Sequence, residues 1–499
     1  MSASTDRPPT TSGPASRAAG WNLEHRYAAL PEALSTRVAP TPVRAPRPVV
    51  FNPGLARELG LDPDLLGRPE AAALFAGNVL PEGADPIAQA YAGHQFGRFT
   101  NLGDGRAVLL GEQRHPGGGV WDIQLKGPGR TPYSRGGDGR AALGPMLREF
   151  VVSEAMWALG IPTTRSLAVV ATGEPVFREE TLPGAVLTRV AASHIRVGTF
   201  EFAAARGIPG LVEALLDHAI SRHDPELAGA PDRAHRWLAK VMERQASLLA
   251  RWMCVGFVHG VMNTDNMAIS GETIDYGPCA FLDRHSAGAV FSSIDHQGRY
   301  AFANQPRIAQ WNLARLAETL LPLLASDEAR AVEVANGLLE GFPARFRRHW
   351  LEGMRAKLGL ASEEPEDAAL SDALFEDMEG RGADFTNTFR DLTRRNPSAE
   401  WPGDTDGFRA WRRRWSERLG RQAGGLEAAQ ARMRRANPAY IPRNARVEEA
   451  LQAAVQGDIE PFGKLLEVVR SPYDHDRDLP GYAEPPAAGA PPYRTFCGT

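Results

Sequence analysis

The sequence has few lysines and few cysteines. Only four of its 56 basic residues are lysines, and only three cysteines occur among its 499 residues. Three cysteines are too few for a disulfide framework or a typical structural zinc site, which fits a reducing cytoplasm. Because arginine supplies nearly all the other positive charge, a lysine kept at a particular position, such as Lys126, is more informative than an arginine.

The sequence also lacks long apolar runs and a large excess of charge. No apolar run approaches the ~18–20 residues that span a bilayer, and 60 acidic residues against 56 basic ones give a formal charge of −4. This composition predicts neither a membrane nor a nucleic acid as partner, and we expect a monomer. Any anion must therefore be bound by local clusters of charge.

The first twenty residues have the composition of a disordered leader. They are rich in Ser, Thr, Pro and Gly and lack the apolar core of a secretory signal, so we predict disorder over 1–20 and a cytoplasmic protein. A mitochondrial transit peptide is the alternative, but Asp6 and the prolines disfavour the amphipathic helix that it would need.

The rest of the chain divides into a strand-rich part and a helical part. Residues 21–200 contain strand-length apolar runs between Gly-rich turns, with a hairpin over "RAVLLGEQ" and "VWDIQLKG" and one helix in "RAALGPMLREFVVSEAMWALGI". Residues 201–475 have mainly helical periodicity, and the Pro-, Ala- and Gly-rich segment 476–499, which contains Cys497, is expected to be a flexible tail. The fold class is therefore α+β.

Lys126 is the first candidate functional residue. Alternation along "VWDIQLKG" places Asp122, Gln124 and Lys126 on one face of a strand, and the following predicted helix carries Glu149. A strand lysine held by a helix glutamate is the arrangement that orients nucleotide phosphates in kinases. The alternatives are a solvated edge strand for Lys126 and a solvated helix position for Glu149.

Two glycine-rich loops could surround phosphate. "LGDGRA" offers Gly103, Gly105 and Arg106, and "GPGRTPYSRGGDGRAALG" ends where the predicted helix begins. Backbone N–H groups, a helix terminus and forked arginine donors all suit an anion. Neither loop is a Walker A or dinucleotide motif, and each taken singly is more often an ordinary turn.

The stretch "HGVMNTDNMAISGETIDYG" contains the residues of a metal–phosphate site. Asp265 is a candidate base, and Asn266 and Asp275 are oxygen ligands of the kind that Mg²⁺ takes beside phosphates; Mn²⁺ would also suit them. We expect "MAISGETI" to form a hairpin that returns Asp275 beside Asn266. The His-Arg-Asp element of protein kinases is absent, and we interpret His259 as a packed loop histidine.

These motifs together resemble the selenoprotein O family, also called YdiU. The resemblance is carried by "LGDGRAVLLGE", "QLKGPGRTPYSRGGDGRA", "REFVVSEAMWALGIPTTR" and "HGVMNTDNM…TIDYGP", and it extends from about residue 50 to Cys497. Members of this family are protein adenylyltransferases with a pseudokinase fold. The resemblance therefore implies a two-lobed, protein-kinase-like fold that binds ATP flipped and transfers AMP, with release of pyrophosphate, to Ser, Thr or Tyr hydroxyls of proteins.

The resemblance also implies roles for particular residues. Asp265 would be the base, and Asn266 and Asp275 would bind the metal. The nucleotide would be surrounded by Gly103, Gly105, Arg106, Lys126, Asp138, Gly139, Glu149, Arg189, Arg196 and Asp275. Two functions remain as alternatives: transfer of the γ-phosphoryl group by a kinase-like enzyme, and a catalytically silent scaffold that binds ATP and regulates partners.

The cysteines suggest redox regulation. Some members of the family carry selenocysteine near the C-terminus, where this chain has Cys497. Cys279 lies four residues after Asp275, so we hypothesise a reversible disulfide between Cys279 and Cys497 that tethers the tail over the nucleotide cleft. Two free thiols are the alternative. Cys254, at the end of an apolar helix, is expected to pack in the core.

Overall fold

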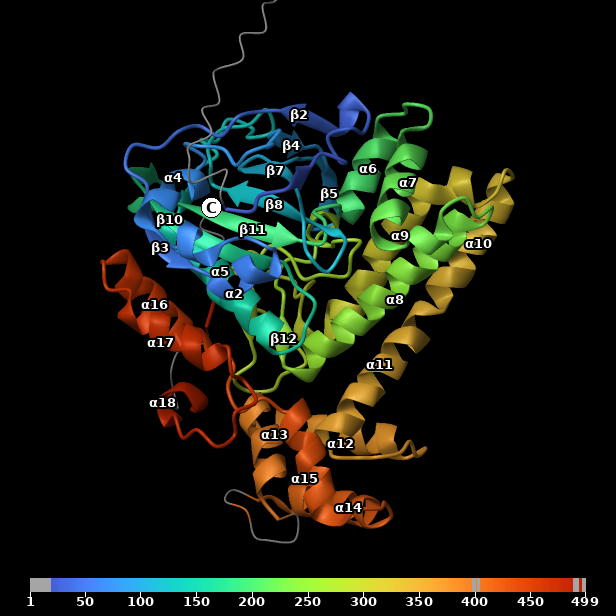
Figure 1. Ribbon diagram of the computed structural model, residues 1–499. Helices are drawn as coiled ribbons and strands as arrows, with labels where there is room; N and C mark the ends of the chain where they lie inside the picture. The colour runs from blue at the N-terminus through green and yellow to red at the C-terminus, as the bar shows by residue number, and fades with distance from the viewer. Residues whose placement is uncertain (1–18, 397–400, 402–403, 488–492, 496–499) are drawn as a thin grey trace, which may run out of the picture.

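The computed structural model describes residues 19–396, 401, 404–487 and 493–495 (Figure 1). Residues 1–18 of the expected leader lie outside the described residues. Ala19, at the end of that leader, is buried, and its carbonyl accepts the amide N–H of Asp62. The described chain therefore joins the folded structure from its first residue.

Nine strands of the described chain form one antiparallel sheet. Its main path runs β2-β4-β7-β8-β11-β10-β3, while β1 pairs with β7 and β9 with β11. The bounds are β1 Leu23–Glu24, β2 Ser35–Arg37, β3 Arg47–Phe51, β4 Ile87–Gln89, β7 Ala107–Arg114, β8 Val120–Lys126, β9 Ala141–Ala142, β10 Arg165–Phe177 and β11 Thr181–Ala191. The predicted β7–β8 hairpin is confirmed.

Strand β8 lies inside this sheet, between β7 and β11. Ile123 and Leu125 pack into a core with three short helices, α2 (Pro53–Glu58), α3 (Pro63–Leu66) and α4 (Ala72–Phe75). The alternate residues Gln124 and Lys126 face the other way and are also buried. The alternative in which Lys126 lies on a solvated edge strand is therefore wrong. The polar face of β8 is part of a site formed inside the protein.

Helix α5 covers the opposite face of the sheet, against β10 and β11. It spans Leu143–Ala158, as the periodicity predicted. Helices α16 (Asn444–Val455) and α17 (Glu460–Val469) pack on its other side (Figure 1), where the ring centroids of Phe150 and Phe462 lie 6.3 Å apart. Because α16 and α17 return to the sheet after the intervening helices, α5 is buried on almost all sides.

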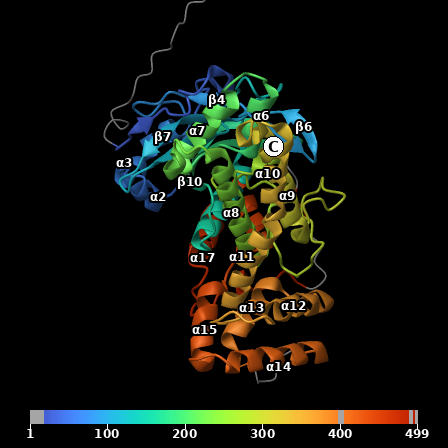
Figure 2. The same cartoon turned by 90° about the vertical axis from the view of Figure 1, so that its right-hand side faces the viewer.

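Helices build the remaining part of the molecule. Figure 2 shows α12 to α15 gathered at the end away from the sheet, with α11 leading to them. No helix among the described residues is long and apolar enough to cross a membrane. The bounds are α6 Val197–Ala205, α7 Leu211–His223, α8 Arg233–Cys254, α9 Gln305–Leu324, α10 Glu328–Glu340, α11 Phe342–Lys357, α12 Asp367–Arg381, α13 Phe385–Arg394, α14 Asp406–Gly420, α15 Gly425–Ala436 and α18 Pro480–Ala483.

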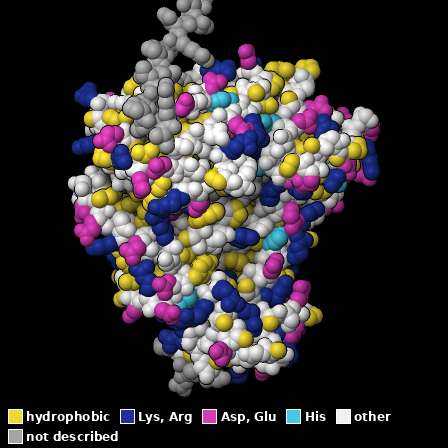
Figure 3. Space-filling view, in the orientation of Figure 1, with side chains coloured by type: hydrophobic (Ala, Val, Ile, Leu, Met, Phe, Trp, Pro, Cys, Tyr) yellow, Lys and Arg dark blue, Asp and Glu magenta, His cyan; other side chains and the backbone are white. Residues whose placement is uncertain are grey.

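The surface and the end of the described chain show two further features. On the face drawn in Figure 3, basic and acidic side chains are interspersed, in keeping with the near balance of charge. Within the segment expected to be a flexible tail, Ala483 of α18 accepts hydrogen bonds from Asn387 and Arg443, and Thr495 pairs with Ser292. These described parts of the tail therefore make specific contacts.

The segment between Asn266 and Asp275 differs from the expected hairpin. Its two arms do not pair with each other: Ala268 bridges to Arg196, and Thr273 bridges to Thr163. The paired strands of this region are instead β12 (Phe257–Val258) and β13 (Ala280–Phe281), which enclose the whole segment. Contacts with distant segments thus replace the local ladder, and the hairpin prediction is wrong.

We predict that Leu147→Ala lowers the free energy of unfolding by about 3 kcal/mol, because it leaves a cavity where α5 meets the core. Val332→Ala, at a position of α10 that is 39% exposed, should change it by less than about 0.5 kcal/mol. Denaturant titration of both variants measures the difference. Equal losses would show that α5 is not a central element of the core.

Candidate active site

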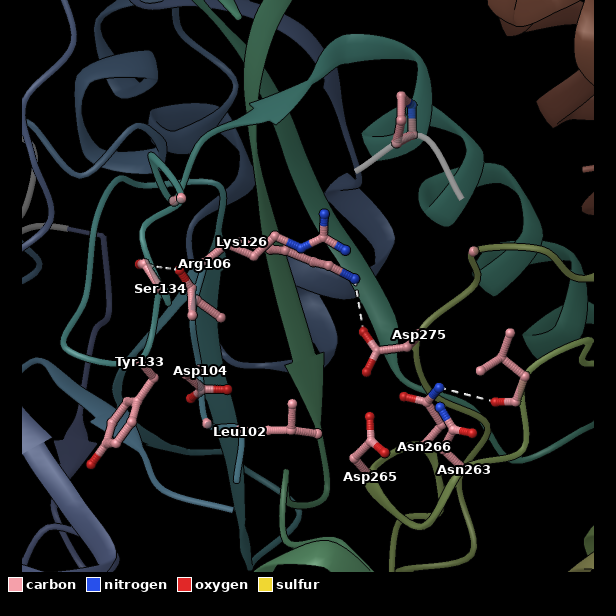
Figure 4. Close-up of a pocket in the computed structure, with 18 of the residues that line it drawn as sticks. Leu102, Asp104, Arg106, Lys126, Tyr133, Ser134, Asn263, Asp265, Asn266 and Asp275 are labelled. Carbon is pink, nitrogen blue, oxygen red and sulfur yellow. Dashed lines mark hydrogen bonds and ion pairs between the residues drawn. The ribbon is translucent and has the colours of Figure 1, made fainter. Parts of the chain in front are cut away.

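A cavity of about 580 Å³ lies between the sheet and the segment that follows β12. Figure 4 shows Lys126 of β8 and residues of the two glycine-rich loops on one side of it, and Asp265, Asn266 and Asp275 on the other. The structure brings every nucleotide- and metal-site residue predicted from the sequence to the lining: Gly103, Gly105, Arg106, Lys126, Asp138, Gly139, Glu149, Arg189, Arg196, Asp265, Asn266 and Asp275.

Lys126 forms the centre of a buried charge cluster. Its Nζ lies 2.5 Å from Glu149 Oε2 on α5 and 2.8 Å from Asp275 Oδ1. Arg189 on β11 contacts the same two carboxylates, at 3.1 Å and 2.7 Å. Glu149 is therefore the partner that the strand–helix pattern predicted for Lys126, and not a solvated helix residue.

Asp275 is the carboxylate on which these cations converge. Arg196 Nη2 lies 3.5 Å from its second oxygen, Oδ2. Burial opposes ionisation, but the charges of Lys126, Arg189 and Arg196 outweigh it and hold the pKa of Asp275 well below its usual value. Asp275 also has φ +62°, in the left-handed region that few non-glycine residues adopt and that Asp tolerates better than most.

Asp265 is in a different electrostatic environment. Its Oδ1 is buried and has no hydrogen-bond partner among the described residues. Burial raises its pKa to about 6, although the charge of Arg196 opposes the shift. A carboxylate that lines the cavity and has a raised pKa is suited to accept a proton near neutral pH.

The backbone of two glycines makes room for Asp265. A Cβ atom at Gly93 would lie 2.1 Å from Asp265 Oδ1. A Cβ at Gly198, at the start of α6, would lie 1.9 Å from the carbonyl oxygen of Ala92, the residue before Gly93. Any side chain at these two positions would therefore push the carboxylate or the strand beside it out of place.

Asn266 and Asp275 provide oxygen atoms at one end of the cavity. Asn266 donates its Nδ2 to the carbonyl of Val261, at 3.0 Å, which leaves its amide oxygen as a possible ligand. Among the described residues, no three His, Cys, Asp or Glu side chains are grouped so that they could hold a metal ion. A Mg²⁺ ion at Asn266 and Asp275 would depend on phosphate oxygens for further ligands, as is usual for this ion.

The two glycine-rich loops pack against each other. Gly103 has φ +124°, and a Cβ there would lie 2.4 Å from the ring of Tyr133 in the second loop. Within the second loop, a Cβ at Gly139 would lie 2.0 Å from the carbonyl oxygen of Gly129. Asp138 lines the cavity, but its carboxylate pairs with Arg178 at 2.9 Å.

Sequence reasoning missed several residues of the lining. Asp104 is buried between Gly103 and Gly105, and burial raises its pKa to about 6. Tyr133 and Ser134 come from the second glycine loop, and Asn263 precedes Asp265 by two residues. All four lie inside the quoted motifs, so their position beside the chosen residues was the signal that could have identified them.

Cys279 and His259 lie behind the cavity. Cys279 is buried, and burial raises the pKa of its thiol to about 11. His259 is fully buried, stacks on Trp252 and makes a 2.8 Å hydrogen bond with the carbonyl of Ile274, so it is the packed loop histidine that we expected. Cys497 lies outside the described residues. Cys254 is partly exposed and packs against the hydrophobic cluster that contains Trp350 and Met354 of α11.

Cations, carboxylates and glycine loops that share one cavity are typical of enzymes that act on nucleoside triphosphates. The comparisons with known proteins agree. The profile of the family "Protein adenylyltransferase SelO" matches residues 18–470, so the chain belongs to this family. It is a nucleotidyltransferase.

Curated relatives are similar over nearly their whole length. The protein nucleotidyltransferase YdiU of Halalkalibacterium halodurans is 58% identical over 484 residues, which cover 96% of this chain and 98% of that protein. The protein of the same name from Geobacillus kaustophilus is 58% identical over 482 residues, with 96% and 100% covered. That of Bacillus cereus is 56% identical over 482 residues, with 96% and 99% covered.

We predict that Gly93→Ala lowers the rate of nucleotidyl transfer about 100-fold, since a shift of ~1 Å in a reacting group is enough for such a loss. ATP affinity should change much less, because Lys126 and Arg189 pair with Glu149 and Asp275 and not with Asp265. Gly463→Ala in α17 is the matched control, because nothing lies within 4 Å of its Cβ position. A Gly93→Ala enzyme with normal turnover would show that the position of Asp265 is not critical.

Proposed function

We propose that the protein transfers AMP from ATP to Ser, Thr or Tyr hydroxyls of other proteins and releases pyrophosphate. The observation that carries the proposal is the contrast between two carboxylates of one cavity. Asp275 is neutralised by three cations, whereas Asp265 keeps an oxygen without a partner. Asp275 is suited to the phosphate end of a nucleotide, and Asp265 is suited to an acceptor hydroxyl.

In the proposed step, the acceptor hydroxyl attacks the α-phosphorus of ATP. An oxygen–phosphorus bond forms to the acceptor, the bond from the α-phosphorus to the bridging oxygen breaks, and pyrophosphate leaves with its electron pair. Asp265, which lines the cavity, takes the hydroxyl proton on its carboxylate. Lys126, Arg189 and Arg196 counter the phosphate charge, which grows on the departing group.

Magnesium fits the oxygen atoms that the chain offers. Asn266 and Asp275 would hold it together with phosphate oxygens, and Mn²⁺ would suit the same donors. When bound, the ion draws electron density from the phosphate and so favours attack. The chain's own residues orient the two ligands, through the bond from Asn266 to Val261 and the ion pairs of Asp275.

We also propose the two-lobed, kinase-like arrangement, divided near residue 200. It is supported by the Lys126–Glu149 pair and by the change of structure near this point, where the last strand of the sheet ends at Ala191 and α6 begins at Val197. The Lys–Glu pair between a strand and a helix is the arrangement that kinases use. A monomer in the cytoplasm remains our expectation.

The deciding experiment uses ATP labelled at either the α- or the γ-phosphorus. The reduced protein is incubated with Mg²⁺, labelled ATP and a cell extract as the source of acceptor proteins. Label from the α position alone supports adenylyl transfer. Label from the γ position alone would make the protein a kinase, and ATP binding with no label from either position would favour the scaffold.

Asp265→Asn is the control within this experiment. It keeps the shape of the side chain but removes the base, so transfer should fall by about 10²–10⁴-fold while ATP binding persists. Chelation of divalent ions should stop transfer, and Mg²⁺ or Mn²⁺ should restore it. Full transfer by Asp265→Asn would contradict the role of base.

We further propose that a Cys279–Cys497 disulfide regulates the site. The proposal is supported by Thr495, two residues before Cys497, whose hydroxyl donates to the carbonyl of Pro278 at 3.1 Å. This bond ties the end of the described chain to the residue before Cys279. Formation of the disulfide would pass two electrons and two protons from the thiols to an oxidant such as a small-molecule disulfide.

The expected result is a peptide that contains both Cys279 and Cys497 after treatment with oxidised glutathione and digestion without reductant. Mass spectrometry detects it, and added dithiol should remove it. Cys254→Ser should keep this peptide and Cys497→Ser should lose it. Oxidised protein that contains no such peptide would reject the switch.

A further inference from the structure

We propose that the mouth of the cavity binds the acceptor polypeptide as an extended, acidic segment with apolar side chains next to the hydroxyl. The binding surface, which we term the acceptor rim, consists of Phe96 and Ile294, which line the cavity, together with Arg98, Phe99, Arg299 and Trp311. The inference rests on the proposed function, since it names the kind of acceptor that the same site would take.

The acceptor rim is built on a hairpin that is fixed to the proposed base. Strands β5 (Ala92–Gln95) and β6 (Arg98–Asn101) pair with each other, and β5 packs on the turn that contains Asp265. The amide N–H of His94 donates to Thr264 Oγ1 at 2.7 Å, and that of Phe96 donates to Asn263 Oδ1 at 3.0 Å. Residues bound at the rim would therefore be held at a constant distance from Asp265.

The turn of this hairpin has an unusual residue. Phe96 and Gly97 have φ +50° and φ +85°, the left-handed pair of a two-residue turn in which Asn-Gly or Asp-Gly is preferred. A phenylalanine there is strained. Its ring lines the cavity and lies 5.1 Å from that of Tyr300. Strain that is kept at the edge of an active site indicates a functional role for the ring.

Exposed apolar side chains continue from this turn. Phe99 on β6 is 45% exposed, and Ile294, which lines the cavity, is 50% exposed. Phe99 belongs to the hairpin that packs on the turn of Asp265, and Ile294 precedes Tyr300, whose hydroxyl donates to Asn263 Oδ1 at 2.6 Å. Apolar groups left open beside a reactive group gain free energy when a partner covers them, so the rim favours apolar residues next to the acceptor hydroxyl.

The acceptor rim carries the positive charges of Arg98, which is exposed, and of Arg299, which is partly exposed. Arg98 and Arg299 have no carboxylate within ion-pair distance among the residues that the structure describes. Arg299 lies 4.9 Å from the ring of Trp311. The nearby Asp295 is engaged by the amide N–H groups of Arg299 and Tyr300, at 2.9 Å and 2.8 Å. Acidic residues on the acceptor would complement this charge.

The edge of β6 favours an extended partner. In an antiparallel ladder, residue pairs that exchange backbone hydrogen bonds alternate with pairs that do not. The bond from the amide N–H of Leu102 to the carbonyl of Tyr91 fixes which pairs of the β5–β6 ladder are hydrogen-bonded. It directs the backbone groups of Phe99 and Asn101 away from β5, and no described strand pairs with that edge. A polypeptide could add to this edge as a third strand, which is a common mode of peptide recognition.

The test measures peptide binding by fluorescence anisotropy. The probes are fluorescein-labelled Glu-Glu-Leu-Ser-Leu-Glu-Glu, the same peptide with Lys in place of Glu, and the same peptide with Gly in place of Leu. Binding is measured with Mg²⁺ and α,β-methylene ATP, which cannot release pyrophosphate. We expect the first peptide to bind at least ten times more tightly than either of the others.

Variants then locate the binding surface. Phe99→Ser combined with Ile294→Ser should weaken binding of the first peptide at least tenfold, and Arg98→Glu should remove the preference for Glu over Lys. Ile459→Ser, at a site before α17 that is 40% exposed, is the matched control and should bind like the wild type. Equal binding of the three peptides, no binding, or no effect of the rim variants would overturn the proposal.

A separate assay distinguishes failure of the proposed function from failure of the acceptor rim as a binding surface. The first peptide is incubated with wild-type protein and α-labelled ATP. Peptide binding that depends on the acceptor rim, without transfer of label, would count against adenylyl transfer but not against the rim. Transfer to the peptide that the rim variants leave unchanged would count against the rim alone.

Discussion

The buried ion pairs among Lys126, Glu149, Arg189 and Asp275 are the interaction on which the site depends. They join a central strand, the helix on one face of the sheet, the neighbouring strand and the segment after β12. Buried charges are costly unless they are paired, so losing one partner would leave the others uncompensated. This cluster therefore holds elements from both halves of the chain in one arrangement around the cavity.

The same arrangement gives two neighbouring carboxylates opposite properties. Asp275 faces three cations and stays ionised, whereas burial raises the pKa of Asp265 to about 6. The residue type is the same, and the difference comes from what surrounds it. Such a separation of pKa values is a common way for an enzyme to obtain a charge-binding group and a base from the same side chain.

Local patterns in the sequence predicted much of the fold and most of the lining. Alternation placed Lys126 on the polar face of a strand, and helical periodicity identified α5, which carries Glu149. The patterns failed where distant segments decide the structure. The expected hairpin after Asn266 is replaced by bridges to Thr163 and Arg196, and α16 and α17 return to cover α5. Neither event has a local signal, because the pairing partners lie far away along the chain.

The sequence by itself determined which groups are available: one strand lysine, a helix glutamate, two glycine loops and the Asp-Asn pair followed by Asp275. Their residue types and spacing fit the phosphate and metal binding that we propose for them, which needs particular atoms at short range. Only the tertiary structure decided how these groups share the charge. It placed three cations around Asp275, left an oxygen of Asp265 without a partner and set a strained hairpin beside it, because electrostatics and burial depend on distances in space and not along the chain.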